Sequence, residues 1–331
     1  MTLKVRFLKQ SELGIFQKLV KNHFPKKNHI FTKKITIINF YYNFFKNKNS
    51  KILGLFYSQK LVAAQGLITM DNWDQKLKKH IYLAFTVKSK TYKKNCLILF
   101  LNYIYNLKPN FLGTVGTNMS TAGMVLDKIS KIKNLDHYYI SNPIIKKKVS
   151  KGLVNNSKNE IVNNKIKMNI NRVLNVLPDT IFEPKKSKKY FINKYLNNPF
   201  YKYNVMNFYK RDKLQFFFIF REIYIKPFKV KIIRVIDFYG NFPKNINISQ
   251  NIVDYLIKNN IEYIDFMVSG TESKIMKKLG FKKKNKDIRI PNHFEPYNSN
   301  KSLLNYGIFI NKYNKQTLVF KGDGDQDRPN K

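Results

Sequence analysis

The chain has 331 residues, 43% of them hydrophobic and 15% aromatic, which is enough to form the cores of two ordinary domains. Its single cysteine, Cys96, excludes a disulfide framework and a cysteine-based zinc cluster, and fits a reducing compartment. No apolar stretch reaches the roughly 20 residues that span a bilayer, and the N-terminus alternates apolar and charged residues, unlike a signal peptide. We therefore expect a cytoplasmic protein without a membrane span.

The formal charge of +42 raises the question of a nucleic-acid or anionic-membrane partner. However, only seven of the 62 basic residues are arginine, and the lysines are spread along the whole chain together with many Asn and Ile residues. This pattern is typical of an AT-rich genome and favours a lysine-coated, soluble surface over a dedicated binding patch.

In the first part of the chain, hydrophobic periodicity predicts a mixed α/β sheet. The predicted strands are 3–7, 51–58, 61–68, 80–88, 111–117 and 136–141. The predicted helices are 11–22, 33–46, 93–107 and 119–132.

A polar connector follows, over residues 146–185, with room for one strand. After it, we expect helices over 186–197, 248–259 and 271–279, and strands near 203–208, 214–225, 228–239, 262–268, from 281, 305–311 and 316–320. The predicted organisation is an N-terminal domain (1–145), the connector (146–185), a C-terminal domain (186–320) and an acidic tail (321–331).

Both halves place a late strand before a short helix, at 111–116 and again at 263–268, which indicates an internal duplication. The order of elements resembles the GNAT (acyl-CoA N-acyltransferase) superfamily, and Lys278-Leu279-Gly280-Phe281 looks like its helix-end signature. Longer phrases resemble a tandem GNAT-like group often associated with surface-polysaccharide biosynthesis. These phrases are Leu135–Pro143, Tyr195–Tyr201, Arg234–Gly240 and Gly322–Asn330.

The resemblance implies an α/β fold with two GNAT-like domains in tandem, each a mixed central sheet flanked by helices. It implies an N-acyltransferase that uses acetyl-CoA or another acyl-CoA. The acceptor would be a small amine, for example an amino sugar of surface-glycan biosynthesis.

In GNAT proteins, a loop of the form Arg/Gln-x-x-Gly-x-Gly/Ala presents backbone N–H groups at a helix N-terminus to the CoA pyrophosphate. The matching stretch here is 92–98, in which Lys93 holds the basic position while Cys96 and Ile98 replace the glycines. The resemblance implies cofactor-binding roles for Lys93, Lys94 and Asn95, and for Asn118, which could also cap the helix after it. The second half has no glycine-rich turn after Gly240, which makes it the poorer cofactor binder.

Two carboxylates near strand ends in the second half, Asp237 and Asp265, are candidate catalytic residues for deprotonating an amine. The alternative is that they pair with Arg234 or with surface lysines. GNAT proteins often place a Tyr on the short helix after the fifth strand as a general acid, and neither 119–132 nor 271–279 contains one.

Candidate substrate-binding residues are fewer and each has a structural alternative. His137 and Tyr138 could line a pocket of the first half or simply pack. Trp73 could stack on a sugar from an exposed turn or pack against a helix. His293 and Glu295 could shape the mouth of a cleft or form a turn.

The acidic tail repeats Asp at positions 323, 325 and 327, like the start of a calcium loop, but the sequence ends before the ligand at loop position 12. We therefore expect no metal site, and either a mobile acidic terminus or a segment folded over a basic cleft.

Two other classes of function stay open. One is a non-catalytic GNAT-like binding or assembly protein, favoured by the missing glycines. The other is a FemAB-like transferase that uses aminoacyl-tRNA, for which RNA would be a partner. The sequence does not decide which half is active, nor the oligomeric state.

Overall fold

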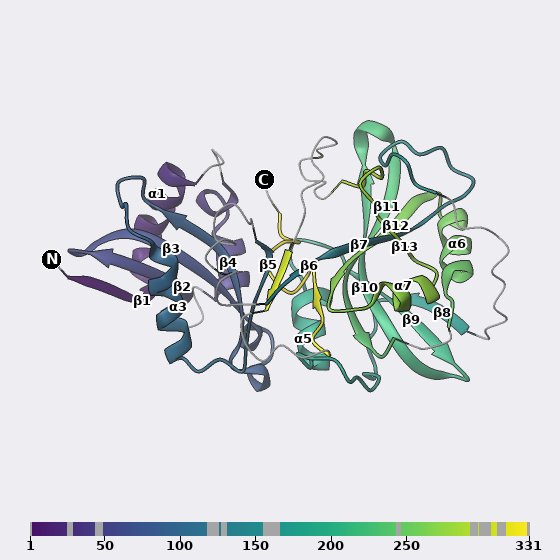
Figure 1. Ribbon diagram of the computed structural model, residues 1–331, viewed down its shortest axis with the longest axis horizontal. Coiled ribbons are helices and arrows are strands. Elements are labelled where there is room, and N and C mark those ends of the chain that lie inside the picture. Colours follow the sequence, from purple (N-terminus) through teal and green to yellow (C-terminus); the bar gives the residue numbers. More distant parts are fainter. Residues whose placement is uncertain are drawn as a thin grey trace. The chain divides into compact units, whose positions relative to one another are not determined.

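Figure 1 shows the computed structural model of the chain. It describes residues 2–24, 29–43, 49–117, 126, 131–154, 166–242, 246–291, 297, 306–309 and 316–329. The chain forms two compact units, and each is described by itself. The first comprises Met1–Ile132, Tyr306–Tyr313 and Asp323–Lys331, and the second comprises Lys133–Asn305 and Asn314–Gly322.

The first sheet has seven strands in the order β1-β2-β3-β4-β5-β14-β6. They are β1 (Leu3–Lys9), β2 (Asn49–Tyr57), β3 (Lys60–Thr69), β4 (His80–Lys88), β5 (Phe111–Thr117), β14 (Tyr306–Phe309) and β6 (Lys131–Asn134). Strands β1 to β4 are antiparallel, and β4 pairs with β5 in parallel. The parallel pair requires a crossover, which α3 (Cys96–Asn106) supplies.

Helices cover both faces of the first sheet. The apolar residues of α3, among them Leu97, Phe100 and Ile104, pack into one core with Leu53 and Leu83 of the sheet. On the other side lie α1 (Leu13–His23) and α2 (Ile35–Tyr42), whose Phe16 and Tyr42 rings lie 5.7 and 5.3 Å from the ring of Phe85 on β4. The sheet is therefore buried on both faces near β4.

The second sheet has eight strands. Seven follow the order β13-β7-β12-β11-β10-β9-β8, and β15 pairs with β12 beside them. They are β13 (Lys282–Lys283), β7 (Asp136–Ser141), β12 (Ile261–Ser269), β11 (Val230–Gly240), β10 (Lys213–Ile225), β9 (Asn204–Lys210), β8 (Ile166–Asn171) and β15 (Val319–Phe320). Again the strands β8 to β11 are antiparallel and β11 pairs with β12 in parallel.

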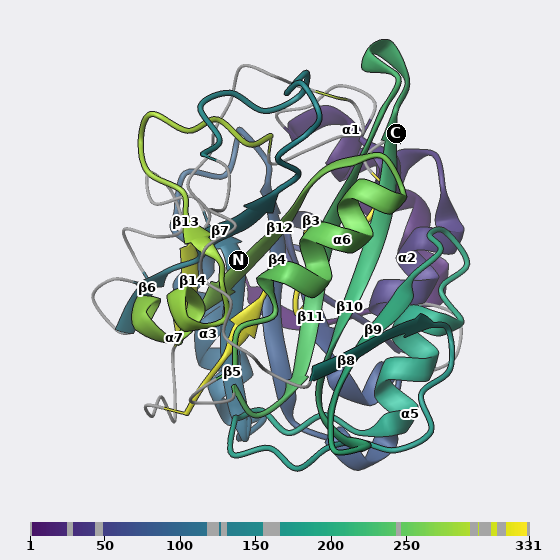
Figure 2. The same cartoon turned by 90° about the vertical axis from the view of Figure 1, so that its right-hand side faces the viewer.

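Successive residues of β10 point to opposite faces of this sheet, and a helix covers each face. Phe216 and Phe218 belong to the core that includes Ile252 and Leu256 of α6 (Ser249–Lys258). Phe217, between them, packs edge-on against Phe191 of α5 (Lys188–Phe191) at 5.1 Å. Figure 2 shows α6 across one face, with the shorter α7 (Ser273–Lys278) near β13.

The predicted α/β fold with two mixed sheets flanked by helices is confirmed. Two strands, however, belong to a different sheet from the one predicted for them. Strand β7, predicted to close the first half, pairs with β12 of the second sheet, and β14, predicted for the second half, pairs with β5 of the first. Local periodicity identifies a strand but carries no information about its partner, so a strand that changes sheets is invisible to it.

Because of these exchanges, the first division between the compact units falls between residues 132 and 133, whereas the predicted domain boundary follows residue 145. The first unit also includes Tyr306–Tyr313 and Asp323–Lys331. The connector contributes one edge strand, β8.

Candidate functional site

An opening in the first sheet lies between its two parallel strands. Their pairing runs from His80 opposite Phe111 to Leu83 opposite Thr114 and then stops, although β4 continues to Lys88 and β5 to Thr117. The strands separate at their carboxyl ends, where ligands bind in open α/β sheets.

A β-bulge accompanies the separation. Thr86 pairs with Gln65 and Leu83 pairs with Leu67, so Ala84 and Phe85 of β4 together oppose Gly66 of β3. A bulge changes which face the following side chains point to and commonly occurs beside active sites. Here it lets Leu83 join the α3 core while Phe85 joins the aromatic rings of α1 and α2.

A cavity of about 710 Å³ occupies the opening, within the usual size range of a ligand pocket. It is lined by Phe24, Gln65, Leu83–Thr86, Lys88, Lys93, Asn95–Leu97, Thr114–Thr117, Leu126, Asp325, Gln326 and Arg328. All of these residues belong to the first unit. The lining combines apolar side chains with cations and hydrogen-bonding groups.

The β4–α3 loop brings cations and a helix N-terminus to this cavity. Lys88 and Lys93 line it, and Asn95 caps α3 by accepting a hydrogen bond from Leu97 N at 2.9 Å. The first turn of a helix carries a partial positive charge and unpaired N–H groups, so this end of the cavity favours an anion.

The structure locates the two residues that replace the expected glycines. Ile98 is 49% exposed and is not part of the cavity wall, so its side chain does not fill the cavity. Cys96 lines the cavity, but it is only 6% exposed and packs into the α3 core. Burial raises the pKa of its thiol, which keeps it neutral. Lys94 is exposed and is also not part of the wall, so among the three predicted loop residues only Lys93 and Asn95 reach the cavity.

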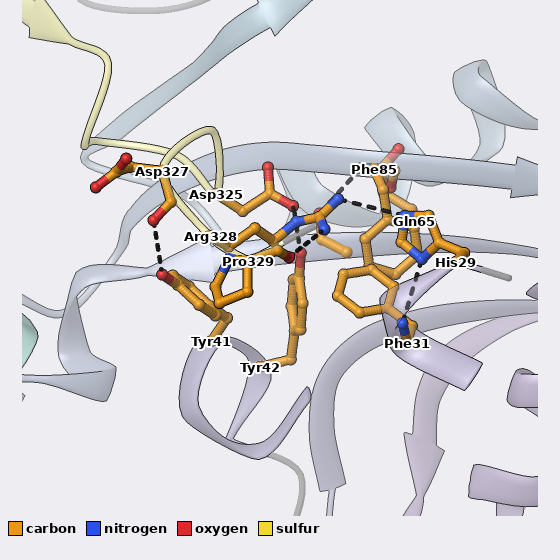
Figure 3. Close-up of polar contacts among 11 residues, drawn as sticks. His29, Phe31, Tyr41, Tyr42, Gln65, Phe85, Asp325, Asp327, Arg328 and Pro329 are labelled. Carbon is orange, nitrogen blue, oxygen red and sulfur yellow. Dashed lines mark hydrogen bonds and ion pairs between the residues drawn. The ribbon is translucent and has the colours of Figure 1, made fainter. Parts of the chain in front are cut away.

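The C-terminal tail forms another wall of the cavity (Figure 3). The Asp325 carboxylate accepts a hydrogen bond from Tyr42 Oη at 2.9 Å, and the same oxygen accepts one from Arg328 Nε at 2.8 Å. The Arg328 guanidinium lies 4.6 Å from the centre of the Phe31 ring. Burial lowers the pKa of Arg328 but the Asp325 carboxylate outweighs it, so the net direction is upward and the cation is retained.

The tail is therefore buried, with Asp323 0% and Asp325 4% exposed, and the interpretation as a mobile acidic terminus is wrong. The described part of the chain contains no group of three His, Cys, Asp or Glu side chains placed to hold a metal ion.

The second sheet separates at the same place in its topology. The parallel pairing of β11 and β12 ends at Val235 opposite Phe266, and the adjacent register places a bulge at Ile236 of β11. Here the opening holds a segment of the chain itself. Val319 and Phe320 of β15 pair with Ser269 and Val268 of β12, and on the other side Gly322 N donates to Ile236 O at 2.9 Å.

This filling segment is tightly packed. The Phe320 ring is stacked on Phe266 at 5.9 Å and belongs to the core of the second sheet. A Cβ atom on Gly322 would lie 2.5 Å from the Ile236 side chain and 2.6 Å from Tyr195 Oη, so only glycine fits there. The second opening is thus part of a core.

Asp237, predicted as catalytic, lies beside the filling segment and is fully buried. Its carboxylate accepts from Lys186 Nζ at 2.6 Å and from Tyr195 Oη at 2.7 Å. The Lys186 ammonium also lies 4.8 Å from the centre of the Phe320 ring. These contacts favour a structural role, and catalysis by Asp237 stays an untested prediction.

Asp265 is also fully buried, on β12. Arg234 Nη2 and His137 Nε2 lie 2.5 and 2.8 Å from one of its oxygens. Burial would raise the pKa of Asp265, but Arg234 and His137 together lower it to about 2. Burial lowers the pKa of His137. The predicted alternative, pairing with Arg234, is confirmed, whereas a catalytic role is not tested.

The predicted substrate-binding residues that the structure describes, His137, Tyr138 and Trp73, do not line the cavity. His137 and Tyr138 are on β7 of the second sheet, and Tyr138 Oη contacts Ser273 at 3.2 Å. Trp73 is 4% exposed and packs against Phe40 and Tyr41 of α2, so the alternative of packing against a helix is confirmed and that of an exposed ring is wrong. Asn118, His293 and Glu295 lie outside the described residues.

Sequence reasoning missed the cavity-lining residues Gln65, Thr86, Gln326 and Arg328. The signal that could have suggested the last two was the phrase Gly322–Asn330, in which Asp at every second position alternates with Gly, Gln and Arg.

Comparison with known proteins supports the fold. No family model and no curated protein matches the sequence. Among solved structures, a GCN5-related N-acetyltransferase from Anabaena variabilis ATCC 29413 is similar, with a TM-score of 0.50 and 10% identity over 93% of this chain and 73% of that one. A probable N-acyltransferase of unknown function from Enterococcus faecalis V583 is similar at a TM-score of 0.50 and 11% identity, over 93% of this chain and 72% of that one.

At such low identity the likeness shows the fold alone, which is that of the GCN5-related N-acetyltransferases, consistent with two such units in tandem. Separately, no helix in the described ranges is long and apolar enough to cross a bilayer.

Proposed function

We propose that the first unit binds an acyl-CoA in the opening between β4 and β5 and transfers its acyl group to a small amine. The observation that carries this proposal is the 710 Å³ cavity at the separated ends of β4 and β5, beside the N-terminus of α3. Backbone groups at such an opening need hydrogen-bond partners, which a ligand would supply here and which β15 and Gly322 supply in the second unit.

The residues of the cavity fit the chemical parts of this cofactor. Lys88, Lys93 and the first turn of α3 would bind the pyrophosphate. Apolar side chains such as Leu83 and Leu97 would contact the pantetheine arm. Acyl-CoA would supply a thioester whose carbonyl carbon is open to attack by an amine.

In the net reaction, a bond forms between the amine nitrogen and the carbonyl carbon, the carbon–sulfur bond breaks, and the nitrogen's proton ends on the sulfur. Buried apolar side chains of the lining, such as Leu83 and Leu97, would limit the water that competes with the amine. An amino sugar is a member of the proposed acceptor class, and surface-glycan assembly is a proposed setting for it.

Isothermal titration of the purified protein with acetyl-CoA tests this proposal. We expect a stoichiometry of one per chain, since the second opening is filled. Lys93→Ala should weaken binding by about fivefold to tenfold through loss of one charge-assisted phosphate contact.

Lys94→Ala is the matched control, because this neighbouring lysine is exposed and is not part of the cavity wall. Absence of binding at millimolar acetyl-CoA would favour the non-catalytic binding protein. Tight, strongly salt-dependent binding of RNA in its place would favour the FemAB-like alternative.

A further inference from the structure

The C-terminal tail brings to the cavity a hydrogen-bonding group that no other described residue uses. The Gln326 carboxamide lines the cavity and, among the described residues, has no hydrogen bond. Gln65, which also lines the cavity, is fully engaged. Its Nε2 donates to the carbonyls of Gly66 and Phe85 at 2.9 and 3.0 Å, and its Oε1 accepts from Thr86 Oγ1.

Gln326 is held in place by its neighbours rather than by its own amide. Asp325, the preceding residue, is fixed by Tyr42 and Arg328, and the carbonyl of Asp327 accepts from Tyr41 Oη at 3.4 Å (Figure 3). Both neighbours of Gln326 are therefore attached to α2, Asp325 through its side chain and Asp327 through its backbone, and this preorganisation lowers the entropic cost of using the Gln326 side chain to bind a ligand.

Gly116 of β5 makes room for the Gln326 side chain. Its φ of +73° lies in the left-handed region, and a Cβ atom there would be only 2.5 Å from Gln326 Cδ. Next to Gly116, Thr117 lines the cavity and its hydroxyl lies 2.7 Å from that of Thr114. The tail and the end of β5 thus form a polar wall, distinct from the cationic wall of the β4–α3 loop.

We propose that Gln326 recognises the acyl acceptor by hydrogen-bonding a hydroxyl group of it, and that the acceptor is a small amine rich in hydroxyl groups. This inference rests on the proposed function. The polar wall offers a carboxamide, a threonine hydroxyl and the Asp325 carboxylate, groups that both donate to and accept from hydroxyls. An apolar amine has no group for the Gln326 amide to hydrogen-bond, so it would gain nothing from this side chain.

The test compares glucosamine, galactosamine and mannosamine with cyclohexylamine, a ring of similar size without hydroxyls, as acceptors for acetyl-CoA. Release of the CoA thiol is followed with a thiol reagent, to which the single, buried Cys96 adds little background. We expect turnover of at least one amino sugar, and about tenfold higher KM for it in Gln326→Ala. The KM for cyclohexylamine should not change.

Gln326→Met serves as a second variant, because it keeps the length of the side chain but cannot donate a hydrogen bond. Gln250→Ala, on the exposed surface of α6, is the control for a glutamine substitution. Fluorescence of Trp73, which lies in the same unit as Gln326, reports whether the variants fold.

Binding of acetyl-CoA, measured by calorimetry, separates the two proposals. If the wild-type protein does not bind it, the proposed function fails and this inference fails with it. If it binds and cyclohexylamine is acetylated at least as fast as every amino sugar, or if Gln326→Ala raises the KM of both acceptor types equally, the proposed function stands and this inference is overturned.

Discussion

Each unit of this protein contains an opening between two parallel strands, and the two openings differ in what they hold. In each, a parallel pair of strands separates after four or so residues beside a β-bulge, at Leu83 and Thr114 in the first sheet and at Val235 and Phe266 in the second. The first opening holds a cavity, whereas the second holds the segment around Phe320.

One stretch of chain accounts for both outcomes. Residues 316–322 fill the second opening, and the residues that follow directly line the cavity in the first unit. Filling places Phe320 in an aromatic core, where its burial stabilises the second unit. When a fold occurs twice in one chain, one opening can therefore stay available for a ligand while the corresponding opening of the other unit becomes part of a core.

Phe320→Ala should destabilise the second unit far more than the first. It removes a buried ring stacked on Phe266, and we expect the free energy of unfolding of the second unit to fall by about 3–5 kcal/mol. Urea unfolding followed by circular dichroism reports both units, while Trp73 fluorescence reports the first. The circular dichroism transition should therefore shift more than the fluorescence transition.

Tyr224→Ala is the control for Phe320→Ala, because Tyr224 is 55% exposed on the same sheet and its removal should cost little. A loss below about 1 kcal/mol for Phe320→Ala would contradict the view that the tail belongs to the second core.

A second prediction concerns the stability of the second unit at low pH. The pKa of Asp265 is lowered to about 2 from 3.8 because Arg234 and His137 outweigh its burial. A carboxylate with a lowered pKa stabilises the fold fully above pH 3.8 and loses that contribution as the pH falls toward 2. The loss amounts to about 2 kcal/mol.

Urea midpoints measured by circular dichroism between pH 5 and pH 2 check this prediction. Asp265→Asn should flatten the decline, although it also weakens the protein at neutral pH by leaving the Arg234 cation buried without a charged partner. Asp254→Asn, on the exposed side of α6, should leave the decline unchanged. A wild-type decline that matches that of Asp265→Asn would contradict the assignment.

Local sequence pattern predicts much of the fold. Strand 214–225 was expected and β10 covers Lys213–Ile225, because alternation and β-branched or aromatic residues determine a strand over its own length. The partners of β7 and β14 were not predictable, because pairing across sheets depends on contacts between distant residues.

Part of the candidate site could likewise be predicted from the sequence and part could not. The resemblance could point to Lys93 and Asn95 because the loop that holds them is continuous in sequence, although the helix was expected from residue 93 and begins at Cys96. The tail wall could not be predicted, because Tyr42 and Asp325 are 283 residues apart and a run of acidic residues resembles a solvated terminus. For Asp265 the pairing with Arg234 was among the predicted alternatives, whereas the partner of Asp237, the buried Lys186, lies 51 residues away and was not identified.

The smallest effect that we predict concerns the attachment of the tail in the first unit. Tyr42→Phe removes one of two donors to the buried Asp325 carboxylate and should lower the free energy of unfolding by about 1.5 kcal/mol, as expected for a hydrogen bond to a charged group. Trp73 fluorescence is the measurement, because this residue packs against the same helix. Tyr41→Phe should cost less, since its hydroxyl makes a longer bond, 3.4 Å, to an uncharged carbonyl. If the two variants lose equal stability, the Asp325 contact does not fix the tail, and the cavity in the first unit would lack the wall that distinguishes it from its filled counterpart.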